Sequence, residues 1–403
     1  QVFISDGSRV TYRDRPDVTL PLNEFGRRVA ASQTTFGNKT MPTIAFWVQD
    51  PRRITTDTIT FRPGSGEFTR DPEGKSALNT WRKQHRPPSS ASVDLFIDHV
   101  TYLVPIEEER EWFLNWLAHI EQCPGELPHS HVLFVTPQTG IGRNLLASVL
   151  ARVWSGATRL GFDLMSSLHS GFNGGLSRRL LVIVDELKAA DTPHGSVNVA
   201  EQLKSMLTTE ERHINVKYGR QFNEFNSARF LMFSQHYDAL PLARTDRRIV
   251  VISNPTERRS PDYYRQAYQR LEDPSFINAV ANWLGSRDIS GFNPSVPAPM
   301  SESKGKAIDA CVSDLEKALI DLRDGTEDRV MTSAQIGQYL ADCGVRGWAG
   351  RAISAAYAAV GFVPCTQVVM RNGKRQRVVA LREGDRLKGA DSATLSKLLD
   401  QWD

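Results

Sequence analysis

Two apolar runs, each followed by residues able to carry chemistry, constrain what this chain can fold into. The first covers residues 131–135 and leads, through a loop that holds Gly140 and Gly142, into the helix-like pattern of residues 145–154. The second covers residues 180–184 and ends in two adjacent carboxylates. Buried strands that alternate with a helix are typical of a parallel sheet with helices on its faces. The sequence therefore predicts an α/β fold with a parallel sheet.

The loop after the first run resembles a phosphate-binding loop, in which backbone N–H groups at a helix N-terminus bind phosphate. In the pattern G-x-x-x-x-G-K-[ST], Gly142 is the second glycine, whereas Pro137, Arg143 and Asn144 replace the first glycine, the lysine and the hydroxyl residue. Arg143 keeps a permanent charge, and Asn144 offers a carbonyl oxygen to Mg²⁺. Taken alone, the loop is equally consistent with an ordinary strand-turn-helix. The residues predicted to bind the nucleotide are Thr139, Gly140, Ile141, Gly142, Arg143 and Asn144.

Asp185 and Glu186 follow the second apolar run and favour the nucleotide site over the ordinary turn. A strand buried in a parallel sheet seldom ends in paired carboxylates without a chemical use for them. In nucleotide hydrolases such an acidic pair holds Mg²⁺ and polarises water. We therefore expect bound ATP and Mg²⁺, with Asp185 and Asn144 as the metal-side residues.

The composition indicates a soluble globular protein of two or three domains. Of the 403 residues, 40% are hydrophobic and 24% charged, and no stretch approaches the ~18 apolar residues of a membrane span. The four cysteines are far apart and lack a C-x-x-C pair, which favours neither a disulfide framework nor a zinc site. We expect the cytoplasm of a bacterial host cell. Because the chain starts at Gln1, we also expect it to be part of a longer protein, and a primase or polymerase upstream of Gln1 is left open.

Proline-rich segments divide the sequence into three predicted domains. Residues 1–90 are a mixed α/β region, with strands expected at 43–48 and 58–61. Residues 91–295 form the nucleotide domain, preceded by a helical lead-in at 91–128. Residues 300–390 follow a proline cluster at 292–299. Helices are expected at residues 106–120 and 263–283. The basic run at residues 81–86 is interpreted as solvated loop charge in preference to a DNA contact.

Three further elements follow the acidic strand. Residues 212–222 form two short alternating runs around a turn, which predicts a β-hairpin with a basic tip formed by Lys217, Tyr218 and Arg220. A third buried strand at residues 228–235 ends in Gln235, where a polar side chain can contact the γ-phosphate or the attacking water. Arg247 and Arg248 precede a fourth strand and are candidates for an arginine finger that reaches a neighbouring subunit's nucleotide.

This ordered set resembles the superfamily 3 helicases of small DNA viruses, phages and plasmids. It is most similar to the helicase part of phage and mobile-element primase-helicases. The resemblance covers roughly residues 93–255 and includes the lead-in at residues 92–99. It implies Asp185 as the magnesium-side acid, Glu186 as the general base and Gln235 in place of the usual asparagine sensor. It further implies Arg248 as the trans-acting finger, with Arg247 as second choice, and Lys217 as the DNA-contacting hairpin lysine.

The C-terminal hundred residues predict a winged-helix domain. Helical patterns at residues 307–322, 332–340 and 350–360 precede two strands that flank an Asn-Gly turn. Clustered, exposed positive charge is what neutralises DNA phosphates. A solvated turn and a protein-docking module are the alternatives. The basic residues of this predicted wing are Arg371, Lys374, Arg375 and Arg377.

The sequence therefore predicts a P-loop, AAA+-like α/β ATPase domain between a mixed N-terminal region and a winged-helix domain. The predicted function is an ATP-dependent DNA helicase for replication of a phage or mobile element, which acts on single-stranded or forked DNA. The resemblance implies a homo-hexameric ring and 3′-to-5′ movement. Two alternatives stay open: a non-hydrolysing replication initiator or loading scaffold with a degraded loop, and a regulator that uses ATP binding as an assembly switch.

Overall fold

The structure is a computed structural model that describes residues 2–5, 9–16, 18–187, 197–219, 221–348, 350–371 and 373–400. The chain divides into two units, with the boundary between Ala307 and Ile308. The division of the first unit at residue 90 stays a prediction.

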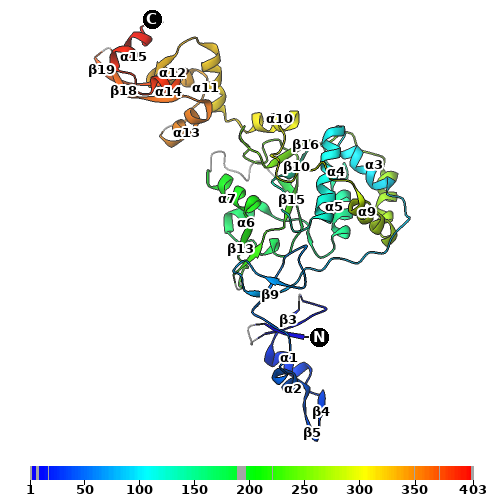
Figure 1. Cartoon of the computed structure of the whole chain (residues 1–403). Coiled ribbons are helices and arrows are strands. Elements are labelled where there is room, and N and C mark those ends of the chain that lie inside the picture. Colours follow the sequence, from blue (N-terminus) through cyan, green and yellow to red (C-terminus); the bar gives the residue numbers. More distant parts are fainter. Residues whose placement is uncertain are drawn as a thin grey trace. The chain divides into compact units, whose positions relative to one another are not determined.

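A five-stranded parallel sheet forms the centre of the first unit (Figure 1). The strand order is β11-β12-β15-β10-β16, and all four pairings of neighbours are parallel. β10 and β15 are buried along their whole length, as expected for strands covered on both faces. The predicted mixed α/β fold with a parallel sheet is confirmed. The strands are β10 (His131–Val135), β11 (Thr158–Arg159), β12 (Leu181–Leu187), β15 (Arg229–Ser234) and β16 (Ile249–Ser253).

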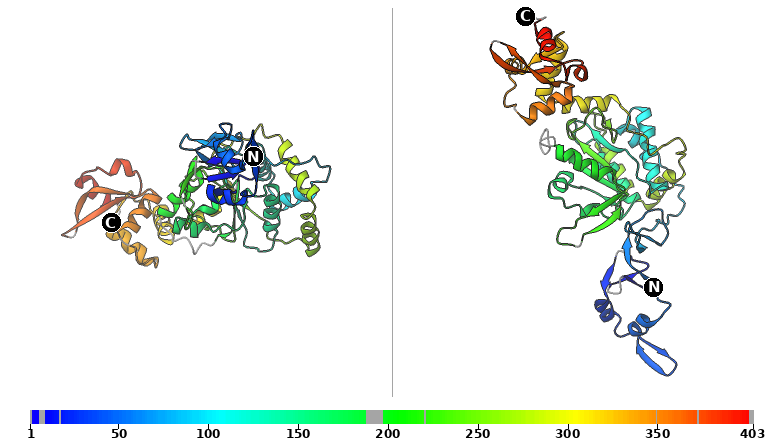
Figure 2. Two further views of the ribbon diagram at one scale, coloured as in Figure 1. Left: turned by 90° about the horizontal axis from the view of Figure 1, so that it is seen from below. Right: turned by 60° about the vertical axis from the view of Figure 1, so that its left-hand side comes forward.

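Helices cover both faces of this sheet (Figures 1 and 2). One layer packs its apolar faces on the sheet and contains α3 (Asp94–Leu103), α4 (Glu107–Gln122), α5 (Arg143–Val153) and α9 (Pro274–Ser286). In this layer Trp116 is fully buried, and its indole nitrogen donates to the Ser130 carbonyl at 3.0 Å. The ring of Phe113 lies 5.1 Å from that of Phe134 on β10. The opposite side carries α6 (Leu164–Ser170), the short 3₁₀ turn Gly174–Leu176 and α7 (Val197–Thr208).

Two long predicted helices are each two helices in the structure. The helix expected at residues 263–283 divides into α8 (Pro261–Arg270) and α9, because Pro274 starts a new helix that Asp273 caps. The helix expected at residues 307–322 divides into α10 (Glu302–Cys311) and α11 (Asp314–Gly325), where Ser313 forms a capping box with Glu316. In both places a local capping signal overrides the apolar periodicity.

The N-terminal region contains short strands and two helices. The strand expected at residues 43–48 is wrong: these residues form α2, in which Ile44, Trp47 and Val48 pack around Phe25 of α1. Apolar residues three and four positions apart favour a helix once they have a surface to cover. The elements are β1 (Val2–Ser5), β2 (Arg9–Tyr12), β3 (Thr19–Pro21), α1 (Leu22–Arg28), β4 (Gln33–Phe36), β5 (Lys39–Pro42), α2 (Thr43–Gln49), β6 (Thr55–Thr56), β7 (Thr58–Thr60), β8 (Phe68–Arg70) and β9 (Ser76–Asn79).

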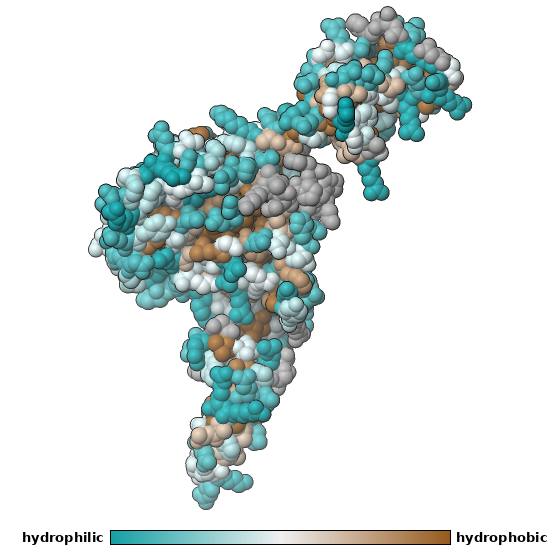
Figure 3. Space-filling view, turned by 180° about the vertical axis from the view of Figure 1, so that it is seen from behind, coloured by the Kyte–Doolittle hydropathy of each residue, from teal (hydrophilic) through white to brown (hydrophobic). Residues whose placement is uncertain are grey.

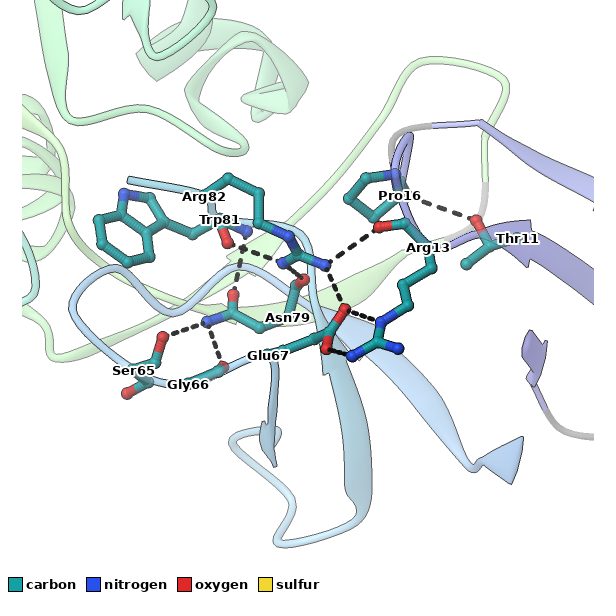
Figure 4. Close-up of polar contacts among 9 residues, drawn as sticks. All are labelled: Thr11, Arg13, Pro16, Ser65, Gly66, Glu67, Asn79, Trp81 and Arg82. Atoms are coloured by element: carbon teal, nitrogen blue, oxygen red, sulfur yellow. Dashed lines mark hydrogen bonds and ion pairs between the residues drawn. The ribbon is translucent and has the colours of Figure 1, made fainter. Parts of the chain in front are cut away.

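A buried asparagine and a shared glutamate organise the end of this region (Figure 4). Asn79, with no exposed surface, donates to the carbonyls of Arg62, Ser65 and Gly66 and accepts from the backbone of Arg62 and Trp81. Glu67 accepts from both Arg13 and Arg82. Side chains thus replace sheet hydrogen bonds in this irregular segment.

The basic run at residues 81–86 fastens this region to the parallel sheet's helices. Arg86 pairs with Glu121 of α4 at 3.1 Å, and the Gln84 amide donates to the Ser155 carbonyl at 2.6 Å. The Arg86 side chain is only 10% exposed, so the expectation of solvated loop charge is wrong for this arginine, whereas Arg82 pairs with Glu67 and stays exposed.

The second unit packs helices against a three-stranded antiparallel sheet of order β17-β19-β18. The second helix, α12, starts at a capping box formed by Thr332 and Gln335. This element order is the one predicted for a winged helix, with β17 and two short C-terminal helices that the sequence did not predict. The elements are β17 (Val330–Thr332), α12 (Ser333–Asp342), α13 (Arg351–Val360), β18 (Val363–Arg371), β19 (Lys374–Ala380), α14 (Gly384–Leu387) and α15 (Ser392–Leu399).

The face of the molecule in Figure 3 is mainly hydrophilic, with apolar residues gathered in small patches. Among the described residues, the longest apolar helices fall short of what is needed to traverse a bilayer.

Arg229 provides a test of how the sheet is anchored. Its fully buried side chain donates to the carbonyls of Cys123, Pro124 and Ser227 at 2.8–3.0 Å and also to that of Glu126. Arg229→Met keeps the length of the side chain but leaves these acceptors unsatisfied, so we expect a loss of roughly 3 kcal/mol or more in the free energy of unfolding. Urea unfolding measures the loss.

The control is Arg265→Met, which removes an exposed arginine paired with Asp262 and is expected to cost less than about 0.5 kcal/mol. Equal midpoints for the two variants would contradict the anchoring role.

Candidate nucleotide-binding site

The loop between β10 and α5 requires its glycines. Gly140 and Gly142 have φ values of 72° and 92°, in the left-handed region that side chains disfavour. A Cβ added to Gly142 would lie 2.6 Å from Cε1 of His99 and 2.9 Å from Cε1 of Tyr264. Gly142 is also the N-cap of α5, without a side chain that caps the helix. The loop therefore brings bare backbone to a helix N-terminus, where the helix dipole and free N–H groups favour an anion.

Asp185 and Glu186 leave the sheet through an irregularity near the end of β12. The register with β15 shifts between Val184 and Leu187, and both carboxylate residues are exposed while these two flanking residues are buried. Glu186 has a φ of 57°, which is uncommon for any residue other than glycine. Such a conformation costs on the order of 1–3 kcal/mol and is found mostly at functional sites. The bulge turns both carboxylates out of the core.

One cavity of about 400 Å³ brings the predicted nucleotide residues together. It lies where β10, β12 and β15 reach their carboxyl ends, the edge of a parallel sheet at which ligands bind in α/β folds. All six loop residues, both carboxylates and Gln235 line it, together with two tyrosines of α8. The lining residues are Thr139, Gly140, Ile141, Gly142, Arg143, Asn144, Asp185, Glu186, Gln235, Tyr264 and Tyr268.

Arg143 lies at the floor of this cavity. Its guanidinium donates to the Ser234 carbonyl at 2.7 Å and lies 5.5 Å above the ring of Phe233. Burial lowers the pKa of Arg143, and the charges of Asp185 and Glu186 oppose that shift. A guanidinium has five donors, so contact with the Ser234 carbonyl and, at 3.5 Å, with the Phe134 carbonyl leaves others for an anion. The side chain thus brings a positive charge between the loop and the two carboxylates.

His99 on α3 supports the loop from beneath and was not predicted as a site residue. The imidazole is 3% exposed; Nε2 lies 2.9 Å from the Gly142 carbonyl and Nδ1 lies 3.0 Å from the Tyr263 hydroxyl. Since a carbonyl only accepts, Nε2 carries the proton and Nδ1 accepts from Tyr263. Burial lowers the pKa of His99 to about 4, so the neutral ring holds the loop at neutral pH.

Residues at the start of α8 hold the other side of the loop. Arg258 donates to the Thr139 carbonyl at 2.7 Å and to its hydroxyl at 3.1 Å. Arg259 pairs with Asp98 of α3 and lies 4.5 Å from the ring centre of Tyr263. The sequence analysis missed this segment. Its signals were the adjacent Arg258-Arg259 and Tyr263-Tyr264 pairs, which lie more than a hundred residues from the loop that they contact.

Arg247 and Arg248 lie at the opposite edge of the sheet. The Arg248 carbonyl accepts from the backbone of His131, the first residue of β10, and β16 begins at the next residue, Ile249. Arg247 is exposed, and Arg248 has a side chain that is 20% exposed and lies 3.6 Å from Asp246. Neither arginine lines the cavity of its own subunit.

The predicted DNA-contacting residues lie on two hairpins. Between β13 (Glu211–Ile214) and β14 (Phe222–Phe225), Tyr218 is 98% exposed, with the Lys217 ammonium 5.3 Å from its ring. Arg220 lies outside the described residues. On the hairpin of β18 and β19, Lys374, Arg375 and Arg377 are exposed, whereas Arg371 lies 3.7 Å from Asp400.

A separate group of metal-ligand type, which the sequence analysis did not predict, lies at the end of α4. Ligand atoms of His119, Cys123 and Glu126 lie within 4.8 Å of one another. The buried guanidinium of Arg229 donates to the backbone of the same loop, and its charge opposes a cation there. Glu126 satisfies Nε2 of His119 at 3.2 Å. We therefore interpret the group as a hydrogen-bonded helix end.

The support by His99 predicts a pH dependence of stability. Above pH 6.5 the imidazole is neutral in both the folded and the unfolded state. Between pH 6.5 and about 4 the unfolded state binds a proton that the folded state does not, so the free energy of unfolding falls with decreasing pH, in total by on the order of 3 kcal/mol. Urea unfolding across this window measures the fall.

His99→Gln removes the titrating group and is the comparison, because buried His131, whose pKa is lowered to about 3, titrates in both proteins. A wild type and a variant with the same pH slope would show that His99 is not the buried neutral base described.

Comparisons with known proteins agree with this architecture. A model of a family of unknown function, DUF5906, matches residues 134–248, from within β10 to the residue before β16. No curated protein matches the chain. An apo structure of the NrS-1 C-terminal region (305-718) matches with a TM-score of 0.63 and 18% identity, covering 94% of this chain and 95% of that one. An A-form apo structure of the same region has a TM-score of 0.59.

Chains named as helicases match with lower TM-scores. A JCV helicase matches at 0.32 and 12% identity, covering 59% of this chain and 66% of that one. The structure titled "SCCmec type IV Cch - active helicase" matches at 0.40 and 11% identity, covering 98% and 93%. The NrS-1 structures thus share the fold of this chain over almost its whole length.

Proposed function

We propose that this chain is an ATP-dependent DNA helicase that acts as a ring of identical subunits in the replication of a phage or mobile element. One observation carries the proposal: the glycine loop, the Asp185-Glu186 pair and Gln235 line a single cavity at the carboxyl edge of the parallel sheet. These residues come from three strands that are separated by up to a hundred residues in the sequence. Parallel strands bring these segments to one edge in any case, but an ordinary strand-turn-helix would not need paired carboxylates there.

The side chains have the chemistry that nucleotide hydrolysis needs. Backbone N–H groups of the loop bind phosphate oxygens at the start of α5, and Arg143 supplies the charge that a lysine usually gives. Asp185 and Asn144 offer the oxygen ligands that suit Mg²⁺, which neutralises charge on the transferred phosphoryl group. Glu186 accepts the proton of the attacking water, and Gln235 orients that water.

The position of Arg248 supports a finger that acts on a neighbouring subunit. Arg248 lies at the amino end of β16, whereas the cavity lies where the strands reach their carboxyl ends. The five residues of β16 span roughly 17 Å at ~3.3 Å per residue. An arginine side chain is too short to cross this distance within one subunit. Arg248, with exposed Arg247 as second candidate, therefore serves the site of the next subunit and makes assembly a requirement for turnover.

DNA contact is assigned to the two hairpins. Lys217 and Tyr218 offer a cation and an exposed aromatic ring, the combination that holds the backbone and stacks on the bases of a single strand. The exposed arginines and lysine of the β18–β19 hairpin neutralise phosphates. Six subunits and 3′-to-5′ movement follow from the family resemblance alone.

The non-hydrolysing initiator scaffold is the second candidate. The observation that favours it is the contact of Arg143 with the Ser234 carbonyl, which engages the guanidinium inside the protein. The strained backbone at Glu186 argues for the hydrolase, because an inert scaffold gains nothing from such strain.

Glu186→Gln tests the motor. The amide keeps the volume but cannot accept a proton, so Mg²⁺-dependent ATP turnover with single-stranded DNA is expected to fall at least ~100-fold. Steady-state phosphate release measures it, with Glu108→Gln, an exposed carboxylate on α4, as the control with unchanged turnover. Wild-type protein that assembles on DNA but does not turn over ATP would contradict the helicase and favour the non-hydrolysing initiator scaffold.

The wing is tested by reversing two of its charges. Lys374→Glu combined with Arg375→Glu is expected to weaken DNA binding about tenfold or more. Because each lost phosphate contact reduces the dependence of log K on log salt by ~0.7–0.9, the slope should also fall by about 1.5. Fluorescence anisotropy at several salt concentrations measures both. Lys388→Glu changes an exposed lysine of the same unit and is the control. Equal salt slopes for the double variant and this control would exclude the wing as a DNA contact.

A further inference from the structure

A buried ion pair holds the loop that carries Arg247 and Arg248. The side chain of Lys304 on α10 is 0% exposed, and that of Asp246 is 13% exposed. The Lys304 ammonium donates to the Asp246 carbonyl at 2.7 Å and lies 3.3 Å from its Oδ1. Lysine is almost never fully buried unless it is paired, and burying the charge costs several kcal/mol. A charge at this position therefore needs a reason.

Asp246 connects this lysine to the start of β16. Its Oδ1 accepts from the backbone N–H groups of Arg248 and Ile249, both at 3.0 Å. Its Oδ2 lies 3.6 Å from the Arg248 guanidinium, beyond hydrogen-bond distance. One carboxylate thus fixes the backbone of Arg248 while it only weakly retains the side chain.

Lys304 explains why that retention is weak. Two cations share the charge of Asp246, and the buried ammonium is the closer one. Burial lowers the pKa of Lys304, and the charge of Asp246 opposes that shift. Without the ammonium, a half-buried carboxylate would have Arg248 as its remaining cation and would bind it more tightly.

Hydrogen bonds hold the start of α10 where Lys304 must be. The Ser301 hydroxyl donates to the Val251 carbonyl of β16 at 3.3 Å and accepts from the backbone of Lys304 at 3.2 Å. The Ser253 hydroxyl at the end of β16 donates to Ser303 at 2.8 Å. The lysine is therefore fixed against the strand that Arg248 precedes.

We propose that Lys304 is a positioning residue for the arginine finger: it neutralises Asp246 and so leaves the Arg248 side chain available to the neighbouring subunit. This inference rests on the proposed function. Lys304 lies 56 positions after Arg248 in the sequence and would affect turnover at the site of the adjacent subunit.

The first test compares Lys304→Met with Lys306→Met in the full chain. Lys306 lies two residues away on the same helix, is exposed and pairs with Glu302. We expect Lys304→Met, like Arg248→Ala, to lower DNA-stimulated ATP turnover at least tenfold, with nucleotide binding and ring assembly retained. Lys306→Met should match the wild type.

Mixed rings separate a finger defect from a defect in the subunit's own site. Glu186→Gln subunits have an inactive site and an intact finger, whereas Lys304→Met subunits have the reverse. In an equal mixture, about a quarter of the interfaces combine an intact site with an intact finger, so turnover should recover toward a quarter of the wild-type value. Arg248→Ala mixed with Glu186→Gln is the positive control.

The outcomes are distinct. A Lys304→Met mixture that stays at the sum of its two components, while the Arg248→Ala mixture recovers, would overturn the positioning role. Turnover of Lys304→Met equal to that of Lys306→Met would overturn it as well. Absence of turnover in the wild type would instead refute the proposed hydrolase and remove the inference with it. Recovery in both mixtures, with both single variants inactive, establishes it.

Discussion

The parallel direction of all five central strands determines where chemistry can occur in this protein. Because the strands run the same way, the segments after β10, β12 and β15 meet at one edge, and the segment before β16 lies at the other. The glycine loop, the paired carboxylates and Gln235 follow strands and therefore share a cavity. Arg247 and Arg248 precede a strand and are therefore kept from it. A single subunit thus has one edge with the cavity and another with the two arginines, and these cannot meet within it.

The sequence predicted the cavity well because its main residues lie next to strong local signals. Gly142, Asp185 and Gln235 each lie within a few residues of the end of an apolar run, so the period of the strands was enough to place them. His99, Arg258 and Tyr264 were missed because their role depends on long-range packing of α3 and α8 around the loop, which no local pattern records. The wrong helix and strand predictions arose where a weak apolar periodicity coincided with a stronger local or packing preference. A capping residue divided two predicted helices, and the apolar face of Ile44 and Trp47 overrode their β propensity.

Several arginines of this fold have partners within the protein, and this changes the meaning of basic residues in the sequence. Arg82 and Arg86 look like a surface patch, yet Arg82 pairs with Glu67, and Arg86 pairs with Glu121 and ties the N-terminal region to α4. Arg229 is fully buried among backbone carbonyls. Arg143 combines a structural contact with a place at the cavity, since it donates to the Ser234 carbonyl and also lines the cavity. In a low-dielectric site a guanidinium so placed attracts phosphate strongly, while its planar fork limits how closely the loop can wrap.

At each edge of the sheet a buried side chain fixes the backbone of a loop, but the two side chains differ in charge. At the carboxyl edge a neutral partner, His99, fixes the backbone of the loop, because the ring is buried and needs only to donate to the Gly142 carbonyl. At the arginine edge a charged partner, Lys304, is needed, because Asp246 must accept backbone N–H groups without also capturing the Arg248 side chain. A neutral residue in place of Lys304 would leave the carboxylate to Arg248, and a charged residue in place of buried His99 would carry the cost of burying an unpaired charge. The two residues thus differ in charge because their partners differ. His99 contacts the Gly142 carbonyl, which a neutral donor satisfies. Lys304 contacts the Asp246 carboxylate, whose charge needs a cation.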